Sequence, residues 1–374
     1  MTMGITSPTS TTGQILKNGS AVISFDANNN ATFAGNVAPT VNSTFRNRII
    51  NGAMVIDQRN AGASINPTDG QFSVDRFVIF RSQASKLTAQ QNAGSVTPPA
   101  GFSNYLGITS SSSYSVVAGD YFLVSQRIEG YNMADLAWGT ANAKTITLSF
   151  WVRSSLTGTF GGSLQNASQN RAYPFTYTIS SANTWTQVSV TIPGCTDGTW
   201  STTNSEGIGL YFGLGVGSTY SGTAGSWVLN TSLFSATGAT SVVGTNGATW
   251  YVTGVQLEVG SSATSFEWRL YNQELANCQR YYEKVVGEAS VQLLADTYST
   301  GSTPVPNINV FYKQTKRAVP TVSTVGTFYT SNVSGGQTYS IGTSNFNVYY
   351  QAGGAGRSYW HNDANSGWAI TAEL

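Results

Sequence analysis

Apolar and polar side chains alternate along Lys144-Thr145-Ile146-Thr147-Leu148-Ser149-Phe150-Trp151-Val152-Arg153. Successive side chains of a strand point to opposite faces, so this period of two predicts a β-strand with one buried face. The same period returns in residues 187–192, 207–217 and 249–260, the last with a bulge expected at Gly254. Turn dipeptides separate these runs, namely Asp69-Gly70, Asp197-Gly198 and Asn246-Gly247. Many short antiparallel strands in one block predict a jelly-roll β-sandwich over residues 46–271.

The chain is poor in charge. Only 9% of its 374 residues are charged, whereas 12% are aromatic and 40 are glycine; about 25% charged is usual. The net charge of +1 without a basic stripe argues against nucleic-acid binding. No run of apolar residues is long enough for a membrane-spanning helix. This composition is typical of a β-rich surface that meets uncharged polar partners, sugars above all.

Histidine and cysteine are scarce. His361 is the only histidine, which argues against Ser-His-Asp catalysis and histidine-based metal sites. Cys195 and Cys278 are far apart in the sequence and cannot build a disulfide framework, so we expect two buried thiols.

Three further segments flank the sandwich. Residues 1–45 hold only short apolar pieces, which would form a β stalk if several chains wind together; the alternative is a flexible tail. Residues 272–286 carry apolar side chains at helical spacing and are predicted to form one short connecting helix. Residues 287–374 return to β character and are predicted to form a small C-terminal β tip domain. The predicted fold class is therefore mainly β.

Aromatic rings on a polar β-surface are the main functional candidates. The apolar face of a pyranose stacks on a Trp or Tyr ring, while amides and hydroxyls bond its hydroxyl groups. Trp151 and Arg153 lie out of phase with the apolar face of their strand, and Tyr211 stands among glycines that leave space over the sheet. We expect these residues to line one sheet face and bind glycan. The alternative is that each ring packs under a loop or against another subunit.

Other candidates lie elsewhere in the chain. The cluster Tyr359-Trp360-His361 predicts an exposed loop that binds a glycan receptor, or else one that fastens the terminus. Glu258 lies out of phase with the core and is the one candidate calcium ligand, since hard cations prefer oxygen; the sequence indicates no other cofactor. The acidic residues show no spacing that marks a catalytic pair, so no enzymatic activity is predicted.

Several motifs carry a family resemblance. They are Asn47-Arg48-Ile49-Ile50-Asn51-Gly52-Ala53-Met54, Val74-Asp75-Arg76-Phe77, Ser125-Gln126-Arg127-Ile128-Glu129-Gly130, Thr249-Trp250-Tyr251-Val252-Thr253-Gly254-Val255-Gln256-Leu257-Glu258-Val259-Gly260 and Cys278-Gln279-Arg280-Tyr281-Tyr282. Together they resemble bacteriophage tail-fibre and virion-appendage proteins with a jelly-roll, carbohydrate-binding-module-like domain. The resemblance implies a location on the virion, a homotrimer, attachment to other tail, baseplate or capsid proteins through the N-terminal segment, and adsorption to bacterial surface polysaccharide. It supplies no ligand residues.

The sequence therefore predicts a non-enzymatic, tail-fibre-type receptor-binding protein that adsorbs a virion to host surface glycan. Three alternatives stay open: a purely structural fibre or decoration subunit, a tailspike-like polysaccharide depolymerase, and a secreted bacterial lectin. Residues 1–8 have neither a basic nor an apolar region, so no signal peptide is predicted. This disfavours the lectin and predicts synthesis in the host cytoplasm.

Overall fold

The chain divides into two compact units, Met1–Thr44 and Phe45–Leu374. This computed structural model describes residues 46–287, 295–301, 308–362 and 365–374, and the backbone of four short strands in the first unit. Those strands form an antiparallel sheet in sequence order: β1 (Gly4–Thr6), β2 (Gln14–Lys17), β3 (Ser20–Phe25) and β4 (Ala31–Phe33). The β character predicted for residues 1–45 is confirmed for these four strands, and the assembly of this segment with other chains stays a prediction.

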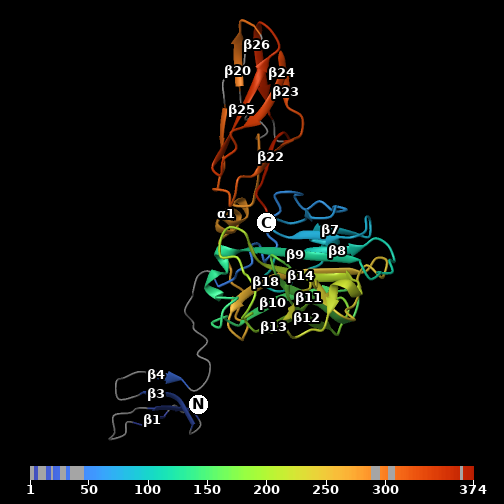
Figure 1. The fold of residues 1–374 in the computed structure, drawn as a ribbon, viewed down its shortest axis with the longest axis vertical. Coiled ribbons are helices and arrows are strands. Elements are labelled where there is room, and N and C mark those ends of the chain that lie inside the picture. The colour runs from blue at the N-terminus through green and yellow to red at the C-terminus, as the bar shows by residue number, and fades with distance from the viewer. Residues whose placement is uncertain are drawn as a thin grey trace. The chain divides into compact units, whose positions relative to one another are not determined.

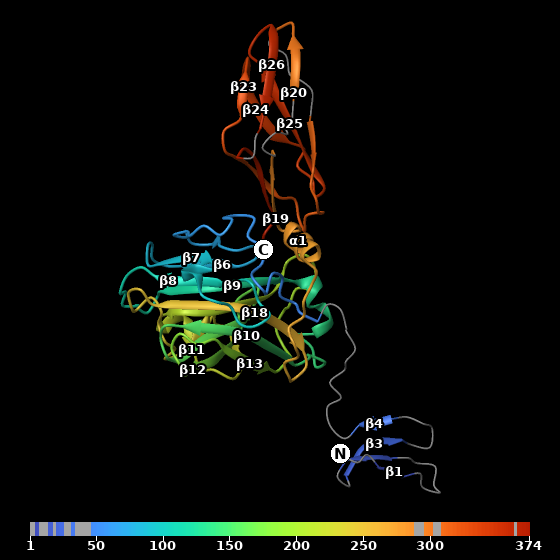
Figure 2. The same cartoon turned by 180° about the vertical axis from the view of Figure 1, so that it is seen from behind.

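Two antiparallel sheets form a jelly-roll sandwich in the second unit (Figures 1 and 2). The five-stranded sheet has the order β13-β10-β18-β8-β7, and the seven-stranded sheet has the order β16-β12-β11-β14-β9-β6-β5. The first contains β7 (Leu87–Gln91), β8 (Leu106–Ser110), β10 (Ile146–Ser154), β13 (Thr186–Ile192) and β18 (Thr249–Val259). The second contains β5 (Gln71–Phe72), β6 (Val78–Arg81), β9 (Tyr121–Glu129), β11 (Gly158–Asn166), β12 (Arg171–Ile179), β14 (Glu206–Val216) and β16 (Val228–Leu229).

Short elements complete the sandwich. The strands β15 (Ser221–Gly222) and β17 (Ser235–Ala236) pair with each other in parallel. The 3₁₀ turns are η1 (Ala93–Ser95), η2 (Gly130–Asn132), η3 (Ala134–Leu136) and η4 (Ser218–Tyr220).

The alternation of apolar side chains builds the core between the two sheets. Leu148, Phe150 and Val152 of β10 point inward and are at most 1% exposed. The ring of Phe150 lies 5.0 Å from that of Phe212, which comes from β14 of the other sheet. The inward phase predicted for these strands is therefore confirmed.

The predicted bulge lies in β18. Gly254 has φ of 62°, and the pairing of β10 with β18 shifts register between Ser149 and Trp151. A Cβ atom at Gly254 would stand 2.7 Å from the Phe102 ring. Both the left-handed backbone and the close ring require glycine at this position.

The described residues after the sandwich form one α-helix and three small sheets. The sheets have the orders β19-β27-β22, β20-β26-β23 and β21-β25-β24. Their strands are β19 (Tyr282–Val286), β20 (Ala295–Ser299), β21 (Ile308–Phe311), β22 (Thr321–Val325), β23 (Tyr329–Ser331), β24 (Val333–Tyr339), β25 (Asn345–Ala352), β26 (Gly356–His361) and β27 (Gly367–Thr371). Phe346, Trp368 and Ile370 lie in the core of this part.

The predicted helix over residues 272–286 is too long. The helix α1 (Tyr271–Gln279) ends before Tyr281, and residues 282–286 form β19, which pairs with β27. A short isolated helix is marginal in water, whereas Tyr282, Val285 and Val286 favour a strand and gain a ladder of hydrogen bonds with β27. Among the described residues, no helix is long and apolar enough to cross a membrane.

Buried charges join the C-terminal part to the sandwich. The carboxylate of Glu373, just beyond β27, forms ion pairs with Arg76 and, at 2.6 Å, with Arg59. The Arg76 side chain is 2% exposed, and its guanidinium lies 3.6 Å from the centre of the Tyr281 ring. Desolvated charges are costly unless paired, so these contacts fix one docking position of β27.

Glu129, at the end of β9, makes the second ionic contact of this junction. Its side chain is 1% exposed and accepts hydrogen bonds from Arg280 at 2.6 and 3.0 Å and from the Tyr281 hydroxyl at 2.6 Å. Burial alone would raise the pKa of Glu129, but these hydrogen bonds and the charge of Arg280 outweigh it and hold the pKa below its usual value.

The variant Glu129→Gln should lower the free energy of unfolding by about 2 kcal/mol, because it leaves the Arg280 charge without its partner and water relieves only part of that cost. Urea denaturation at pH 7 measures the loss. The matched control is Asp197→Asn, which breaks a similar bidentate pair with Arg171 at a carboxylate that is 51% exposed. The control should cost less than about 1 kcal/mol. Equal losses in both variants would contradict the role given to burial.

The pKa of Asp75 is shifted in the direction opposite to that of Glu129, and this makes stability depend on pH. Burial raises its pKa to about 6, against the lowering effect of hydrogen bonds from Gln58 and the charge of Arg59. Between about pH 4 and pH 6 the folded protein holds a proton here that the unfolded chain has released, so this group lowers stability as the pH rises. We expect the stability of Asp75→Asn relative to the native chain to increase by about 2 kcal/mol from pH 4 to pH 7. Urea denaturation at both pH values measures this, and a constant difference would contradict it.

Candidate functional site

A groove of about 320 Å³ lies on the outer face of the seven-stranded sheet. We call it the sandwich groove. Its lining residues are Asp69, Phe80, Tyr121, Leu123, Arg127, Gln169, Tyr211, Tyr220, Ser232 and Phe234. Half of them come from β6, β9 and β14, whose register sets Ser125 beside Tyr211 and Phe80 beside Leu123. Residues on neighbouring strands therefore supply a continuous surface.

Rings make the floor and walls of this groove. Tyr211 is 2% exposed and Phe234 is 9% exposed, with 5.1 Å between their ring centres. Tyr121 and Tyr220 are half-buried, stand edge to face at 5.7 Å, and both contact Phe234. Each ring is held by at least one other ring, so the groove is shaped before any ligand enters.

The glycines of β14 have two separate uses. A Cβ atom at Gly209 would lie 2.7 Å from Cε2 of Tyr211, so the missing side chain lets the Tyr211 ring lie back along its own strand. A Cβ atom at Gly213 would lie 2.6 Å from Oγ of Ser235, so this glycine admits the segment that crosses the sheet. The space predicted over β14 is thus filled by a neighbouring segment at Gly213, while Tyr211 lines the groove.

Polar groups lie at the edges of the groove. Arg127 forms an ion pair with Glu206 at 3.2 Å, and its guanidinium lies 5.2 Å from the centre of the Phe80 ring. Asp69 and Gln169 are exposed. Burial, with a smaller contribution from Glu206, raises the pKa of Tyr211 to about 12, so its phenol stays protonated at neutral pH. The groove thus offers carboxylate, guanidinium, amide and hydroxyl groups beside its rings.

Trp151 and Arg153 lie on the other sheet. Both belong to β10 and are half-buried, and Arg153 stacks 5.5 Å from the Tyr251 ring while it donates to the carbonyl of Asn183. The expectation that Trp151 and Tyr211 share one sheet face is therefore wrong. Strand phase shows that both rings point away from the core, but it does not show to which sheet each strand belongs.

The cluster near the C-terminus is a strand and not a loop. Tyr359, Trp360 and His361 lie in β26, and the period of two separates them. Tyr359 and His361 face outward with 4.6 Å between their ring centres, and they line a shallow cavity of about 420 Å³ with Tyr329 and Arg357. Trp360 faces the core of the tip. The predicted loop is wrong because pairing with β20 and β23 extends the strand.

Glu258 does not form a metal site with other acidic groups. Its carboxylate is 2% exposed and accepts hydrogen bonds from Gln256 and from the backbone and hydroxyl of Thr264, all within 2.8 Å. Among the described residues, no three His, Cys, Asp or Glu side chains are grouped to hold an ion. Cys195 and Cys278 are free and buried, as expected.

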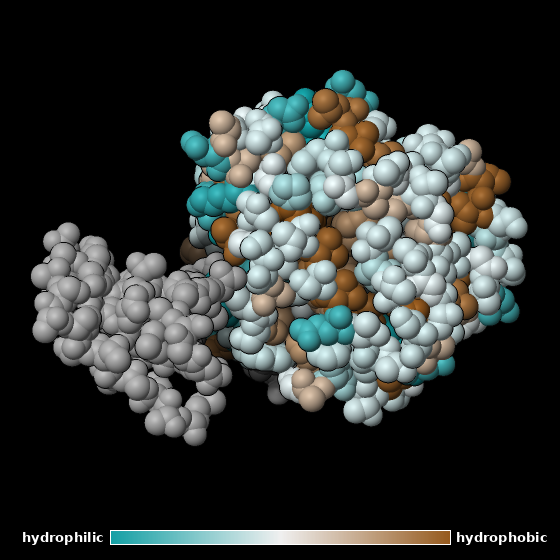
Figure 3. Space-filling model, turned by 90° about the horizontal axis from the view of Figure 1, so that it is seen from below, coloured by the Kyte–Doolittle hydropathy of each residue, from teal (hydrophilic) through white to brown (hydrophobic). Residues whose placement is uncertain are grey.

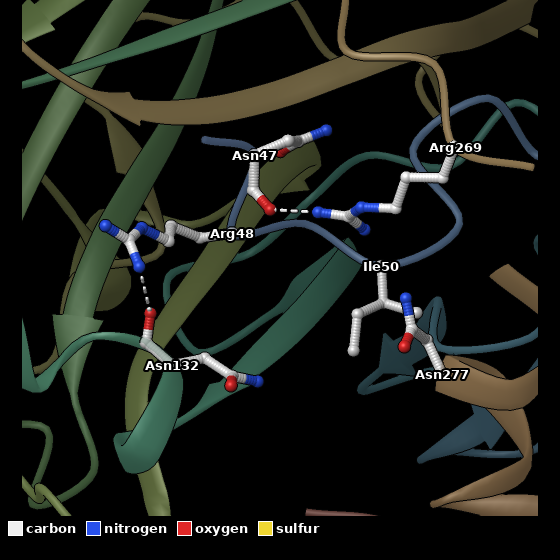
Figure 4. A pocket seen from close by; sticks show the side chains of 6 residues that line it. All are labelled: Asn47, Arg48, Ile50, Asn132, Arg269 and Asn277. Carbon is white, nitrogen blue, oxygen red and sulfur yellow. Dashed lines mark hydrogen bonds between the residues drawn. The ribbon is translucent and has the colours of Figure 1, made fainter. Parts of the chain in front are cut away.

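Figure 4 shows a smaller cavity, of about 130 Å³, where the segment after Phe45 meets η2 and α1. In it Arg48 donates to the carbonyl of Asn132 at 3.1 Å and Arg269 donates to the carbonyl of Asn47. Each guanidinium is also paired with a carboxylate. These contacts hold chain segments together, so the sandwich groove is the better candidate for a ligand.

The face in Figure 3 shows the polarity expected from the composition. Most of it is white or pale teal, and the brown hydrophobic patches are separated from one another. A surface of this kind offers hydroxyls and amides more than charges, which agrees with the charged fraction of 9%.

No protein-family model and no curated protein sequence matches the chain. Among solved structures, the enzymatically active domain of tailspike protein 4 from bacteriophage CBA120 matches 57% of this chain and 22% of its own, at 12% identity and a TM-score of 0.30. The carbohydrate-binding module TmCBM61, solved with β-1,4-galactotriose, matches 57% of this chain and 99% of its own, at 9% identity and a TM-score of 0.30. The family 11 carbohydrate-binding module from Clostridium thermocellum matches 53% of this chain and 96% of its own, at 11% identity and a TM-score of 0.26. Likenesses this distant carry no argument about function, which rests on the groove.

Of the candidates predicted from sequence, only Tyr211 lines the sandwich groove. The sequence does carry a signal for two groove residues that it did not single out. Tyr121 precedes the core residue Phe122, so it points outward from β9, as Arg127 does. Gln169 and Ser232 lie outside the strands, and no periodic pattern marks residues that come together only through the fold.

The variant Gly209→Ala should displace the Tyr211 ring and lower the free energy of unfolding by about 1–3 kcal/mol, because the added methyl group overlaps Tyr211 and Glu206. Thermal unfolding measures the loss, and a structure of the variant would show the ring position. The control is Gly119→Ala, where a Cβ atom would meet nothing within 4 Å. An unmoved Tyr211 in Gly209→Ala would contradict this account of the groove floor.

Proposed function

We propose that this protein binds an uncharged saccharide in the sandwich groove and acts as a tail-fibre-type receptor-binding protein of a bacteriophage, adsorbing the virion to bacterial surface glycan. The observation that carries the proposal is the combination of clustered rings and polar edges on one sheet face. The proposal covers binding and not catalysis, because Asp69 is the one carboxylate among the described residues that line the groove. Glycoside cleavage requires two carboxylates in one site.

The rings suit the apolar faces of sugars. Tyr121 and Tyr220 are half-buried, so each keeps part of its ring open while the other part packs on Phe234. Ring stacking removes water from both surfaces and needs no charge on the ligand. Because the rings are already packed together, little side-chain entropy is lost on binding.

The polar edge suits sugar hydroxyls. A hydroxyl both donates and accepts, and the groove offers an acceptor in Asp69, a donor in Arg127 and both in Gln169. The charge of Arg127 is neutralised by Glu206 at 3.2 Å. Among the described lining residues, the carboxylate of Asp69 carries the charge that remains. It disfavours an anionic ligand, so a neutral saccharide fits better.

The proposed role on the virion rests on the sequence resemblance and on residues 1–45. The strands described in the first unit are three to six residues long, and a unit of about 40 residues usually needs oligomerisation or another support to be stable. Association of several chains, which we take to be a homotrimer, would supply the missing contacts. Residues 1–45 would also attach the fibre to other tail, baseplate or capsid proteins. Several weak groove sites per fibre would then raise avidity through effective concentration.

The variant Tyr121→Ala should weaken binding to neutral glycans about tenfold, because it removes an exposed stacking surface. A glycan array identifies the saccharide, and titration calorimetry on that saccharide measures affinity. The native affinity should change less than about twofold between 50 and 500 mM NaCl, because no charge of the ligand is screened.

Trp151→Ala is the matched control, since it removes an outward ring from the other sheet. It should leave affinity unchanged; loss of binding in Trp151→Ala with retention in Tyr121→Ala would move the site to the five-stranded sheet. Absence of glycan binding by the native protein would favour a structural subunit. Release of reducing ends from host polysaccharide would favour a depolymerase.

A further inference from the structure

We infer that each chain carries a second saccharide site, on the outer face of the sheet β20-β26-β23 in the C-terminal part. We call this surface the tip face and define it by Tyr298, Tyr329, Arg357, Tyr359 and His361. It is separate from the sandwich groove in its residues and its sheet. The inference goes beyond the proposed function, because it gives one chain two binding sites.

Strand register brings these residues to one side. Tyr298 of β20 lies directly opposite Arg357 of β26, and Tyr329 of β23 lies directly opposite His361. Residues directly opposite in an antiparallel pair share a face, as do residues two apart in one strand. Rings from all three strands therefore stand on a single surface.

The two outer rings of the tip face are open to solvent, whereas Tyr359 and His361 are half-buried. Tyr298 is 81% exposed and Tyr329 is 61% exposed. Between these strands, Tyr359 stacks on His361 at 4.6 Å, and Arg357 lies 5.6 Å from the Tyr359 ring. The core of the tip does not use these side chains, so their exposure is not explained by folding.

The opposite side of the same sheet makes the surface rigid. Trp360 lies between Tyr359 and His361 in sequence and points the other way, into a cluster with Phe328 at 4.9 Å and Trp368 at 6.1 Å. A ring platform fixed from behind loses little entropy when a ligand stacks on it.

The size of the tip face indicates a small ligand. The tip face spans three strands at about 4.8 Å spacing and about 13 Å along β26. A stable protein–protein interface takes about 20–30 residues on each side, whereas the tip face is defined by five. The five residues that define the tip face supply aromatic rings together with phenol, imidazole and guanidinium groups. This combination suits a ligand that has apolar faces and hydroxyl groups around its edge. A short stretch of saccharide chain meets both requirements.

The experiment uses the full chain and four proteins: the native chain, the groove variant Tyr121→Ala, the tip variant Tyr298→Ala/Tyr329→Ala, and the tip control Thr330→Ala. Thr330 is exposed on β23 but lies opposite Trp360, so it is out of phase with the rings. All four are applied to an array of neutral hexose and N-acetylhexosamine oligosaccharides and to purified host-surface polysaccharide. Circular dichroism checks that the exposed substitutions leave the fold intact.

A second site predicts that some saccharides keep binding Tyr121→Ala and bind the tip variant about tenfold or more weakly, while Thr330→Ala behaves as the native chain does. If the tip variant binds every saccharide as well as the native chain does, the second site is overturned; the groove proposal then stands where Tyr121→Ala loses binding and fails where it does not. If only the tip variant loses binding, the groove proposal fails and the tip site stands. If the native chain binds no saccharide, both fail.

Discussion

The packing of the two inner sheet faces determines which side chains the sandwich presents to solvent. Phe122 and Phe212 are fully buried in this core, and the residue before each of them is a tyrosine that must point the other way. Tyr121 and Tyr211 therefore stand on the outer face because the core positions are fixed. The groove is thus a direct consequence of core packing, with the glycines of β14 deciding how the rings lie on it.

Several of the few charged side chains lie where chain segments meet. Glu373, Arg76 and Glu129 hold β27 and α1 to the sandwich, and Lys316 pairs with Glu283 at 3.2 Å with both side chains fully buried. Charges placed in this way determine how segments dock, because an unpaired partner would be left desolvated. The outer surface carries few charges beside its hydroxyls, amides and rings, and both proposed sites combine rings with polar groups.

Much of the sandwich could be predicted from sequence, because its information is local. The alternation at residues 146–152 and the glycine at position 254 each leave a mark within a few residues, and both predictions are confirmed. The spacing of residues 282–286 predicts a helix, but the strand is decided by β27, more than eighty residues later. Strand phase is local and predicts Trp151 and Tyr211 on one face, whereas sheet membership depends on distant pairing.

The groove and the tip face are both built on strands, and this bears on how two weak sites would act together. Residues 45–374 form one compact unit, and the contacts of Glu373 and Glu129 join the strands of the tip to those of the sandwich. Two sites in one body meet a polysaccharide at a fixed separation, so binding at one raises the effective concentration at the other. A flexible connection would spread that concentration over a larger volume. If both proposed sites bind, the buried ion pairs of the junction bear on avidity, while the rings of each site determine its own affinity.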